Sequence, residues 1–229
     1  MKALEALFHT LDTQPEIPLD GSILFLHALA HPALEAWRGR LTCEQVWKPA
    51  ALRLQHSGIP STREAAGTFD AVLLLPERQR DTVLADFAKA HDLLNEGGTL
   101  VVALHNDWGA KRMEQQLASV AGELQTVSKS HCRVFWAKKH PGWKTAQLAQ
   151  WRQNAAMRRI LDGRFWSMPG LFHWDAIDEG SALLVEHLPR DLRGAVADLG
   201  AGWGFLSQHL LHHCPDIRSL DMYEADSRA

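Results

Sequence analysis

The chain has 229 residues, of which 46% are hydrophobic and 22% are charged. This length suits one large domain or two small ones, at roughly 100–200 residues per domain, and the composition excludes a fully disordered chain. No apolar run approaches the roughly 20 residues of a membrane span, and the acidic, amphipathic N-terminus lacks a signal-peptide cleavage site. Three widely spaced cysteines argue against a disulfide framework and favour a reducing, cytoplasmic location.

The net charge of −3 does not indicate a nucleic-acid binder, but the charge is unevenly distributed. Residues 1–137 carry 13 basic and 16 acidic side chains, residues 138–164 carry 7 and 1, and residues 165–229 carry 4 and 10. The middle stretch is therefore a basic island of net charge +6. Its plainest interpretation is a solvated linker and helix. The alternative is an RNA-binding surface, which would use the phosphate contacts of Lys138, Lys139, Lys144, Arg158 and Arg159.

In the first half of the chain, predicted strands alternate with predicted helices. Apolar runs predict strands at residues 22–27, 42–47, 51–56, 69–75, 99–104 and 133–138. Apolar spacing predicts helices at residues 32–38, 83–94 and 113–124, with a turn at 95–98. Strands that alternate with helices imply parallel pairing, so we expect an α/β domain with a doubly wound, Rossmann-like sheet.

A Pro-Gly pair at residues 141–142 marks the expected end of this first domain. Beyond it, the pattern predicts helices at residues 145–162, 179–188 and 205–213, and strands at 195–199 and 220–223. We therefore expect a first domain over residues 1–140, a basic linker and helix over 141–164, and the beginning of a second domain over 165–229.

The strongest chemical pattern is VADLGAGWGF at residues 196–205. An apolar strand leads to Asp198, and Gly200, Gly202 and Gly204 then precede a helix. Glycines allow a sharp turn and close approach of a ligand to the backbone, and the helix N-terminus offers unpaired N–H groups. Glu224 ends the next strand, where an acidic side chain can bind both hydroxyls of a ribose. These five residues predict a site for a nucleoside-bearing cofactor.

The glycine spacing distinguishes between two classes of cofactor. The dinucleotide fingerprint G-x-G-x-x-G would place its third glycine at position 205, which is Phe205. An NAD-dependent oxidoreductase is therefore the weaker alternative. The pattern D-x-G-x-G-x-G instead resembles motif I of the class I methyltransferases, which use S-adenosylmethionine. A glycine-rich turn without a ligand is the purely structural interpretation.

Two upstream segments sharpen this resemblance: FWSMPGLFHW at residues 165–174 and DEGSALL at 178–184. They resemble the segment before motif I in the bacterial ribosomal-RNA small-subunit methyltransferase C family, whose members methylate guanine N2. The resemblance implies a second domain that binds S-adenosylmethionine and small-subunit ribosomal RNA as the partner. It also implies a first domain that has lost its cofactor motif and serves as an RNA-binding or scaffolding module. In agreement, HALAHP at residues 27–32 follows the first strand and contains no glycine.

The chain departs from the family in one respect. The catalytic Asn-Pro-Pro-Phe of the family is absent, so we expect an N-terminal fragment with no catalytic residue of its own. The alternative function for such a fragment is a non-catalytic RNA-binding or scaffolding module. Apolar side chains of its short second sheet are expected to lack partners.

Two further clusters have a structural and a functional interpretation. His209, His212, His213 and Cys214 could suggest zinc, but they lack partners at ligand spacing elsewhere, so we expect no metal site. Tryptophans accompany the basic island, and aromatic and cationic side chains together suit unstacked RNA bases. Packing between domains is the structural interpretation of the tryptophans at positions 143, 151, 166 and 174.

Overall fold

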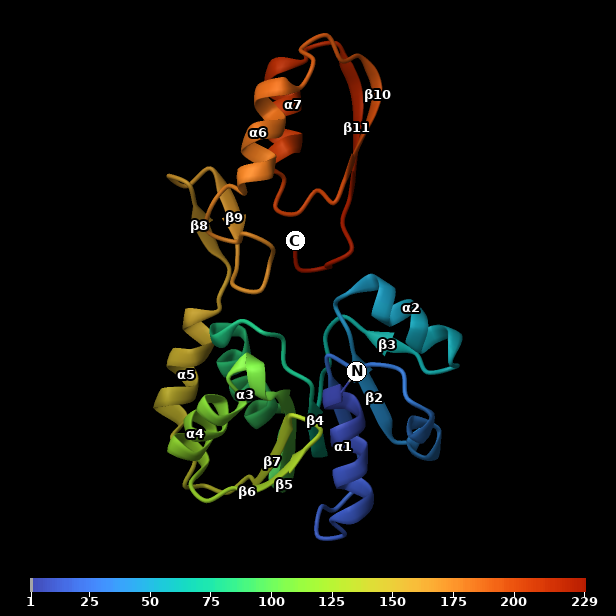
Figure 1. The fold of residues 1–229 in the computed structure, drawn as a ribbon, viewed down its shortest axis with the longest axis vertical. Coiled ribbons are helices and arrows are strands. Elements are labelled where there is room, and N and C mark those ends of the chain that lie inside the picture. Colours follow the sequence, from blue (N-terminus) through green and yellow to red (C-terminus); the bar gives the residue numbers. More distant parts are fainter. Residues whose placement is uncertain (1) are drawn as a thin grey trace. The chain divides into compact units, whose positions relative to one another are not determined.

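The computed structural model describes residues 2–229 and divides the chain into two compact units, Met1–Ala155 and Ala156–Ala229 (Figure 1). The division lies inside the segment that the sequence predicts as a basic linker. The helix at the start of that segment, α5 (Thr145–Asn154), packs on the first unit through Trp151, which lies 6.2 Å from the ring of Phe87.

The first unit is built on a seven-stranded sheet with the order β3-β2-β1-β4-β5-β7-β6. Strands β1 to β5 pair in parallel where they are neighbours, as expected for a doubly wound sheet. Strand β7 is antiparallel to both β5 and β6, because Ser130 and His131 both adopt positive φ and close a tight hairpin between β6 and β7. The strands are β1 (Ile23–Leu26), β2 (Leu41–Glu44), β3 (Ser61–Thr62), β4 (Phe69–Leu74), β5 (Leu94–His105), β6 (Gln125–Lys129) and β7 (Cys132–Lys138).

Helices cover both faces of this sheet, which explains the continuous apolar strands in the sequence. Successive side chains of β4 enter different cores: Leu73 packs in one cluster and Leu74 in the other. One core contains residues of α1 (Lys2–Thr13), a 3₁₀ helix at Pro32–Trp37 and α2 (Lys48–His56). The other contains residues of α3 (Arg80–Leu93), α4 (Ala110–Ala121) and α5.

The second unit is smaller and less well buried. An antiparallel hairpin of β8 (Arg158–Ile160) and β9 (Phe165–Ser167) is followed by α6 (Glu179–His187). Strand β10 (Gly194–Leu199), helix α7 (Phe205–His213) and strand β11 (Ile217–Tyr223) then form a parallel βαβ unit. As expected, apolar side chains of this sheet lie open to solvent, among them Leu199 (78% exposed) and Met222 (53%).

Several predicted elements are wrong in type or extent. Residues 51–56 belong to α2 and are not a strand; Pro49 lies in the first turn of this helix, where its missing N–H costs nothing. The predicted helix over 145–162 ends at Asn154, and residues 158–160 form β8 instead. The predicted turn at 95–98 lies within β5, and β6 was not predicted because it is short and half polar.

Candidate functional site

The glycine turn joins β10 to α7 in the second unit. Gly200, Gly202 and Gly204 have φ angles of 82°, 51° and 91°, a region that residues with a Cβ rarely adopt. No described atom lies within 4 Å of the positions where Gly200 and Gly202 would carry a Cβ, so this side of the turn is open. Helix α7 begins directly after Gly204, and no described side chain caps it. Its first N–H groups therefore remain available for a ligand.

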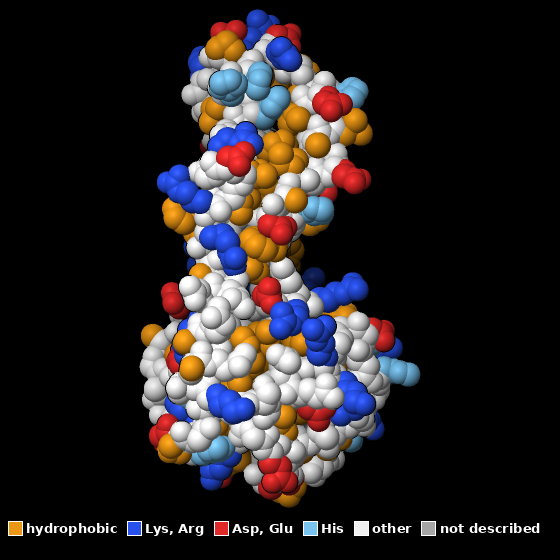
Figure 2. All heavy atoms as spheres, turned by 90° about the vertical axis from the view of Figure 1, so that its left-hand side faces the viewer, with side chains coloured by type: hydrophobic (Ala, Val, Ile, Leu, Met, Phe, Trp, Pro, Cys, Tyr) orange, Lys and Arg blue, Asp and Glu red, His pale blue; other side chains and the backbone are white. Residues whose placement is uncertain are grey.

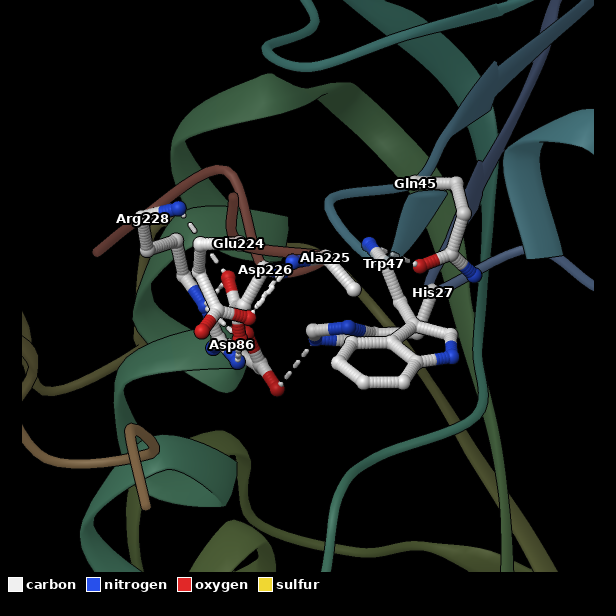
Figure 3. Close-up of polar contacts among 8 residues, drawn as sticks. All are labelled: His27, Gln45, Trp47, Asp86, Glu224, Ala225, Asp226 and Arg228. Carbon is white, nitrogen blue, oxygen red and sulfur yellow. Dashed lines mark hydrogen bonds and ion pairs between the residues drawn. The ribbon is translucent and has the colours of Figure 1, made fainter. Parts of the chain in front are cut away.

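Glu224 follows β11 directly and connects to the glycine turn through a hydrogen bond. Its Oε2 accepts the N–H of Gly202 at 2.9 Å. Its Oε1 accepts the N–H groups of Ala225 and Asp226 at 2.6 and 2.8 Å (Figure 3). The structure thus brings together Glu224 and the glycines, as the sequence predicts. A carboxylate offers about four lone-pair sites, so acceptor capacity remains on Oε2.

Asp198 has a structural contact that the sequence analysis missed. It is buried, and its Oδ2 accepts the hydroxyl proton of Ser207 at 2.6 Å. Because Ser207 lies in the first turn of α7, this bond ties the end of β10 to the start of the helix behind the glycines. A direct contact between Asp198 and a ligand stays a prediction.

A cavity of about 500 Å³ lies beside the turn, within the second unit. Gly202, Trp203, Met222 and Glu224 form one side of this cavity, and the β8–β9 hairpin forms another through Arg164, Phe165 and Trp166. Its volume is within the usual range of roughly 300–1,000 Å³ for small-molecule sites. The sequence analysis missed Trp203 and Phe165, whose rings lie 4.9 Å apart.

A smaller hollow of about 60 Å³ also borders the glycines. It is lined by Phe172, His173 and Asp178 from the two upstream segments. Trp203 Nε1 donates to the carbonyl of His173 at 3.2 Å, and Asp178 caps α6 by accepting the N–H of Ser181 at 2.9 Å. The segments that carry the sequence resemblance therefore pack directly against the glycine turn.

The basic residues of the predicted RNA surface have different surroundings. Lys139 donates from Nζ to the carbonyls of His91 and Leu94 at 2.9 and 2.8 Å, and its side chain is only 11% exposed. It therefore stabilises the C-terminal end of α3. Lys138 and Lys144 are exposed in the first unit, whereas Arg158 and Arg159 belong to the hairpin of the second unit.

The first unit has no open turn at the end of β1. His27 adopts a φ of 52°, and its Nε2 lies 2.9 Å from Oδ2 of Asp86 (Figure 3). At the end of β2, Glu44 is buried and accepts both the ammonium of Lys89 at 2.6 Å and the N–H of Ala65 at 2.8 Å.

The remaining reactive side chains form no further site. No group of three or more His, Cys, Asp or Glu residues within residues 2–229 could hold a metal ion. The rings of His209 and His213 stack at 4.1 Å, and burial and the neighbouring cations lower the pKa of His209. Burial raises the pKa of Cys43 to about 12, which makes its thiol unreactive. Over the same residues, no helix is long and apolar enough to cross a membrane.

Comparison with known proteins matches the second unit to one family. A family model for the methyltransferase small domain matches residues 162–229. The ribosomal RNA small subunit methyltransferase C of Shewanella loihica is 30% identical over 172 residues, which are 72% of this chain and 48% of that protein. The protein of the same name from Psychromonas ingrahamii is 24% identical over 70% of this chain and 46% of its own length. The chain thus spans about half the length of these relatives.

One solved structure matches nearly the whole chain. The 16S rRNA N2 G1207 methyltransferase of T. thermophilus, solved with AdoMet and guanosine, superposes with a TM-score of 0.72. It covers 97% of this chain and 63% of its own, at 24% identity, which establishes a shared fold. The predicted α/β, Rossmann-like methyltransferase fold and the predicted resemblance to the ribosomal RNA small subunit methyltransferase C family are therefore both confirmed.

Proposed function

We propose that the second unit binds S-adenosylmethionine at the glycine turn and that the protein methylates the exocyclic amine (N2) of a guanine in small-subunit ribosomal RNA. The observation that carries the proposal is the hydrogen bond from Gly202 to Glu224, which places an exposed acid beside three left-handed glycines and an open cavity. The curated relatives named ribosomal RNA small subunit methyltransferase C support the choice of substrate class.

The residues present fit this cofactor. Gly200 and Gly202 leave open the space that a side chain would fill, so the methionine part of the cofactor can approach the backbone there. Glu224 suits the ribose hydroxyls, which are hydrogen-bond donors. The cofactor is a sulfonium cation, and the acids Asp198 and Glu224 make this end of the sheet favourable for positive charge. Asp198 supports the turn through Ser207.

The cofactor supplies an electrophilic methyl group. The lone pair of the guanine amine would form a bond to the methyl carbon as the C–S bond breaks, leaving a neutral thioether, and the proton of the amine would pass to solvent. Residues of this chain would bind and orient the reactants and exclude water at the cavity. We assign none of them as the proton acceptor.

Guanine N2 as the target is supported by the solved T. thermophilus methyltransferase of the same fold, whose complex contains guanosine. We propose that the first unit binds or positions RNA without a cofactor, because His27 and Glu44 occupy the ends of β1 and β2 with internal contacts. Exposed Lys138 and Lys144 remain candidates for its phosphate contacts, whereas Lys139 is used internally.

A calorimetric titration of the 229-residue chain with S-adenosylmethionine tests the cofactor site. We expect saturable binding that falls at least about 10-fold in Glu224→Gln and no binding of NADH. Asp221→Asn is the matched control, because it removes an exposed carboxylate from β11, the strand that Glu224 directly follows. Absence of binding at about 1 mM cofactor, a threshold near −4 kcal/mol, would contradict the proposal.

A second experiment separates an enzyme from a non-catalytic module. Small-subunit ribosomal RNA is incubated with the protein and cofactor labelled in the methyl group, and its digest is analysed for N2-methylguanosine. Retention of RNA without methyl transfer, together with no cofactor binding, would favour the RNA-binding or scaffolding module.

A further inference from the structure

The β8–β9 hairpin presents a planar cation–aromatic pair to solvent. Arg159 and Trp166 lie directly opposite each other in the antiparallel register, and the guanidinium carbon lies 5.1 Å from the centre of the indole. Arg159 also donates from Nη1 to the carbonyl of Gly163 at 2.8 Å, which fixes the guanidinium in place. Trp166 remains 56% exposed, so a large part of its surface is accessible to a ligand.

The hairpin geometry explains why these two side chains face outward together. Leu161, Asp162 and Gly163 have φ angles of 49°, 58° and 81°, which closes a tight turn between the strands. Side chains alternate across a strand, so Ile160 and Phe165 point inward while their neighbours Arg159 and Trp166 point outward.

A second pair of the same kind lies in this unit. Arg158 is placed over the ring of Trp174 at 5.0 Å, and the neighbouring Phe172 is 74% exposed. Figure 2, which looks onto the side of the molecule that carries the hairpin, shows basic and hydrophobic side chains next to one another on this unit. Residues 156–168 carry three arginines and one aspartate, a net charge of +2.

We infer that the Arg159–Trp166 pair forms a stacking platform for an unpaired base of an RNA strand. Flat indole and guanidinium faces stack on bases, and arginine also contacts phosphates. A duplex hides its base faces in its own stack, so this surface favours a single strand. The sequence analysis assigned Arg158 and Arg159 to phosphates and raised base stacking for the tryptophans of the basic island in general; the geometry pairs Arg159 with Trp166 on one exposed surface.

The platform borders the proposed cofactor site. Trp166 and Arg164 line the same cavity of about 500 Å³ as Gly202 and Glu224. A base stacked on Trp166 would therefore lie beside the methyl donor, so the platform would position the strand that carries the target guanine. This positioning role rests on the proposed function, whereas RNA binding by the platform does not.

Binding of a fluorescent single-stranded 12-nucleotide RNA to the 229-residue chain, without cofactor, tests the inference. One stacked base contributes enough that we expect Trp166→Ala to weaken binding roughly 5- to 150-fold. Trp108→Ala is the matched control, since Trp108 is 44% exposed in the first unit, and we expect it to bind as the unsubstituted protein does. Thermal unfolding of both variants checks that they are folded.

A second set of binding measurements separates the contribution of base stacking from that of charge. Arg159→Lys keeps the charge and loses the planar group, so we expect weaker binding with an unchanged salt dependence. An RNA with abasic positions and a duplex of the same sequence should both bind the unsubstituted protein more weakly than the intact single strand. Equal binding of all three nucleic acids, or unchanged binding by Trp166→Ala, would overturn the inference. Weaker binding of Trp166→Ala to anionic vesicles, without an effect on RNA, would also overturn it.

The cofactor titration distinguishes this failure from failure of the proposed function. Unchanged RNA binding by Trp166→Ala, together with saturable cofactor binding by the unsubstituted chain, would reject the platform alone. Base-dependent RNA binding without cofactor binding would reject the proposed function alone.

Discussion

Both units place an acidic residue at the end of the second strand of a parallel pair, but the surroundings of the two acids differ. Glu44 in the first unit is 5% exposed and is held by Lys89 and the N–H of Ala65. Glu224 in the second unit is exposed and accepts the N–H of Gly202. An acid at this position of the fold is therefore not by itself a binding site.

The turns that follow the first strand of each pair, β1 and β10, also differ in how much space their side chains fill. After β1, His27 adopts a left-handed conformation and pairs with Asp86, so its side chain fills the region beside the strand end. After β10, Gly200 and Gly202 adopt left-handed conformations without side chains and leave that region open. The comparison indicates that, in the same arrangement of strands, the turn residues decide whether the space at the strand end is filled by side chains or left open.

The largest expected difference between the units concerns their cores. Leu73→Ala empties a fully buried position in β4, and we expect the free energy of unfolding of the first unit to fall by about 2–5 kcal/mol. Leu199→Ala removes the same atoms from an exposed position in β10 and should cost less than about 0.5 kcal/mol. Urea unfolding, monitored by hydrogen exchange in each unit, measures the loss in the free energy of unfolding for each variant. Equal losses in the two variants would contradict the comparison.

The two acids should respond differently to the same substitution. Glu44→Gln leaves Lys89 without its partner, and we expect a loss of about 2 kcal/mol in stability, less than for a fully buried pair because Lys89 is partly exposed. Glu224→Gln should leave stability nearly unchanged and lower cofactor affinity at least about 10-fold. The double variant Glu44→Gln/Lys89→Gln should recover part of the loss. A loss of stability in Glu224→Gln as large as that in Glu44→Gln would contradict the distinction between a structural acid and an acid available for a ligand.

Two glycines with the same φ of 91° test whether the turn itself binds a ligand. Gly67→Ala and Gly204→Ala should each cost about 1 kcal/mol of stability in their own unit, because alanine is strained at positive φ. Only Gly204→Ala should also weaken cofactor binding in the calorimetric titration. Weaker cofactor binding by Gly67→Ala would point to a general loss of stability instead.

The smallest expected effect is a dependence on pH confined to the first unit. Hydrogen bonds from the side chain of Asn95 and from Ser22 hold the pKa of Asp70 below its usual value. The ionised form is therefore favoured by folding, and this contribution is complete above the unfolded pKa near about 4 and is lost as the pH falls through the lower folded pKa. Asp70→Asn should be less stable than the unsubstituted protein at pH 7 and equally stable in strong acid. A difference that persists at low pH would contradict this account.

Much of the fold follows from patterns that are local in sequence. Ala71–Leu74 in β4 and the apolar part of β5 are continuous hydrophobic runs, and such runs predict strands buried on both faces. Helix α7 begins directly after Gly204, as the glycine spacing predicts. Residues 51–56 and 158–160 were assigned to the wrong type of element because short amphipathic runs suit either a strand or a helix until packing selects one.

The proposed cofactor site also divides into what the sequence predicts and what only packing decides. The residues Gly200, Gly202, Gly204 and Glu224 and their order along the chain were readable from the sequence, because closely spaced glycines favour a left-handed turn. The internal pairing of Glu44 with Lys89 and of Lys139 with the carbonyls of α3 was not readable, since each joins residues more than 40 positions apart. Whether a charged side chain binds a ligand or stabilises the core depends on the partner that packing places within hydrogen-bond distance, and only the tertiary structure determines that partner.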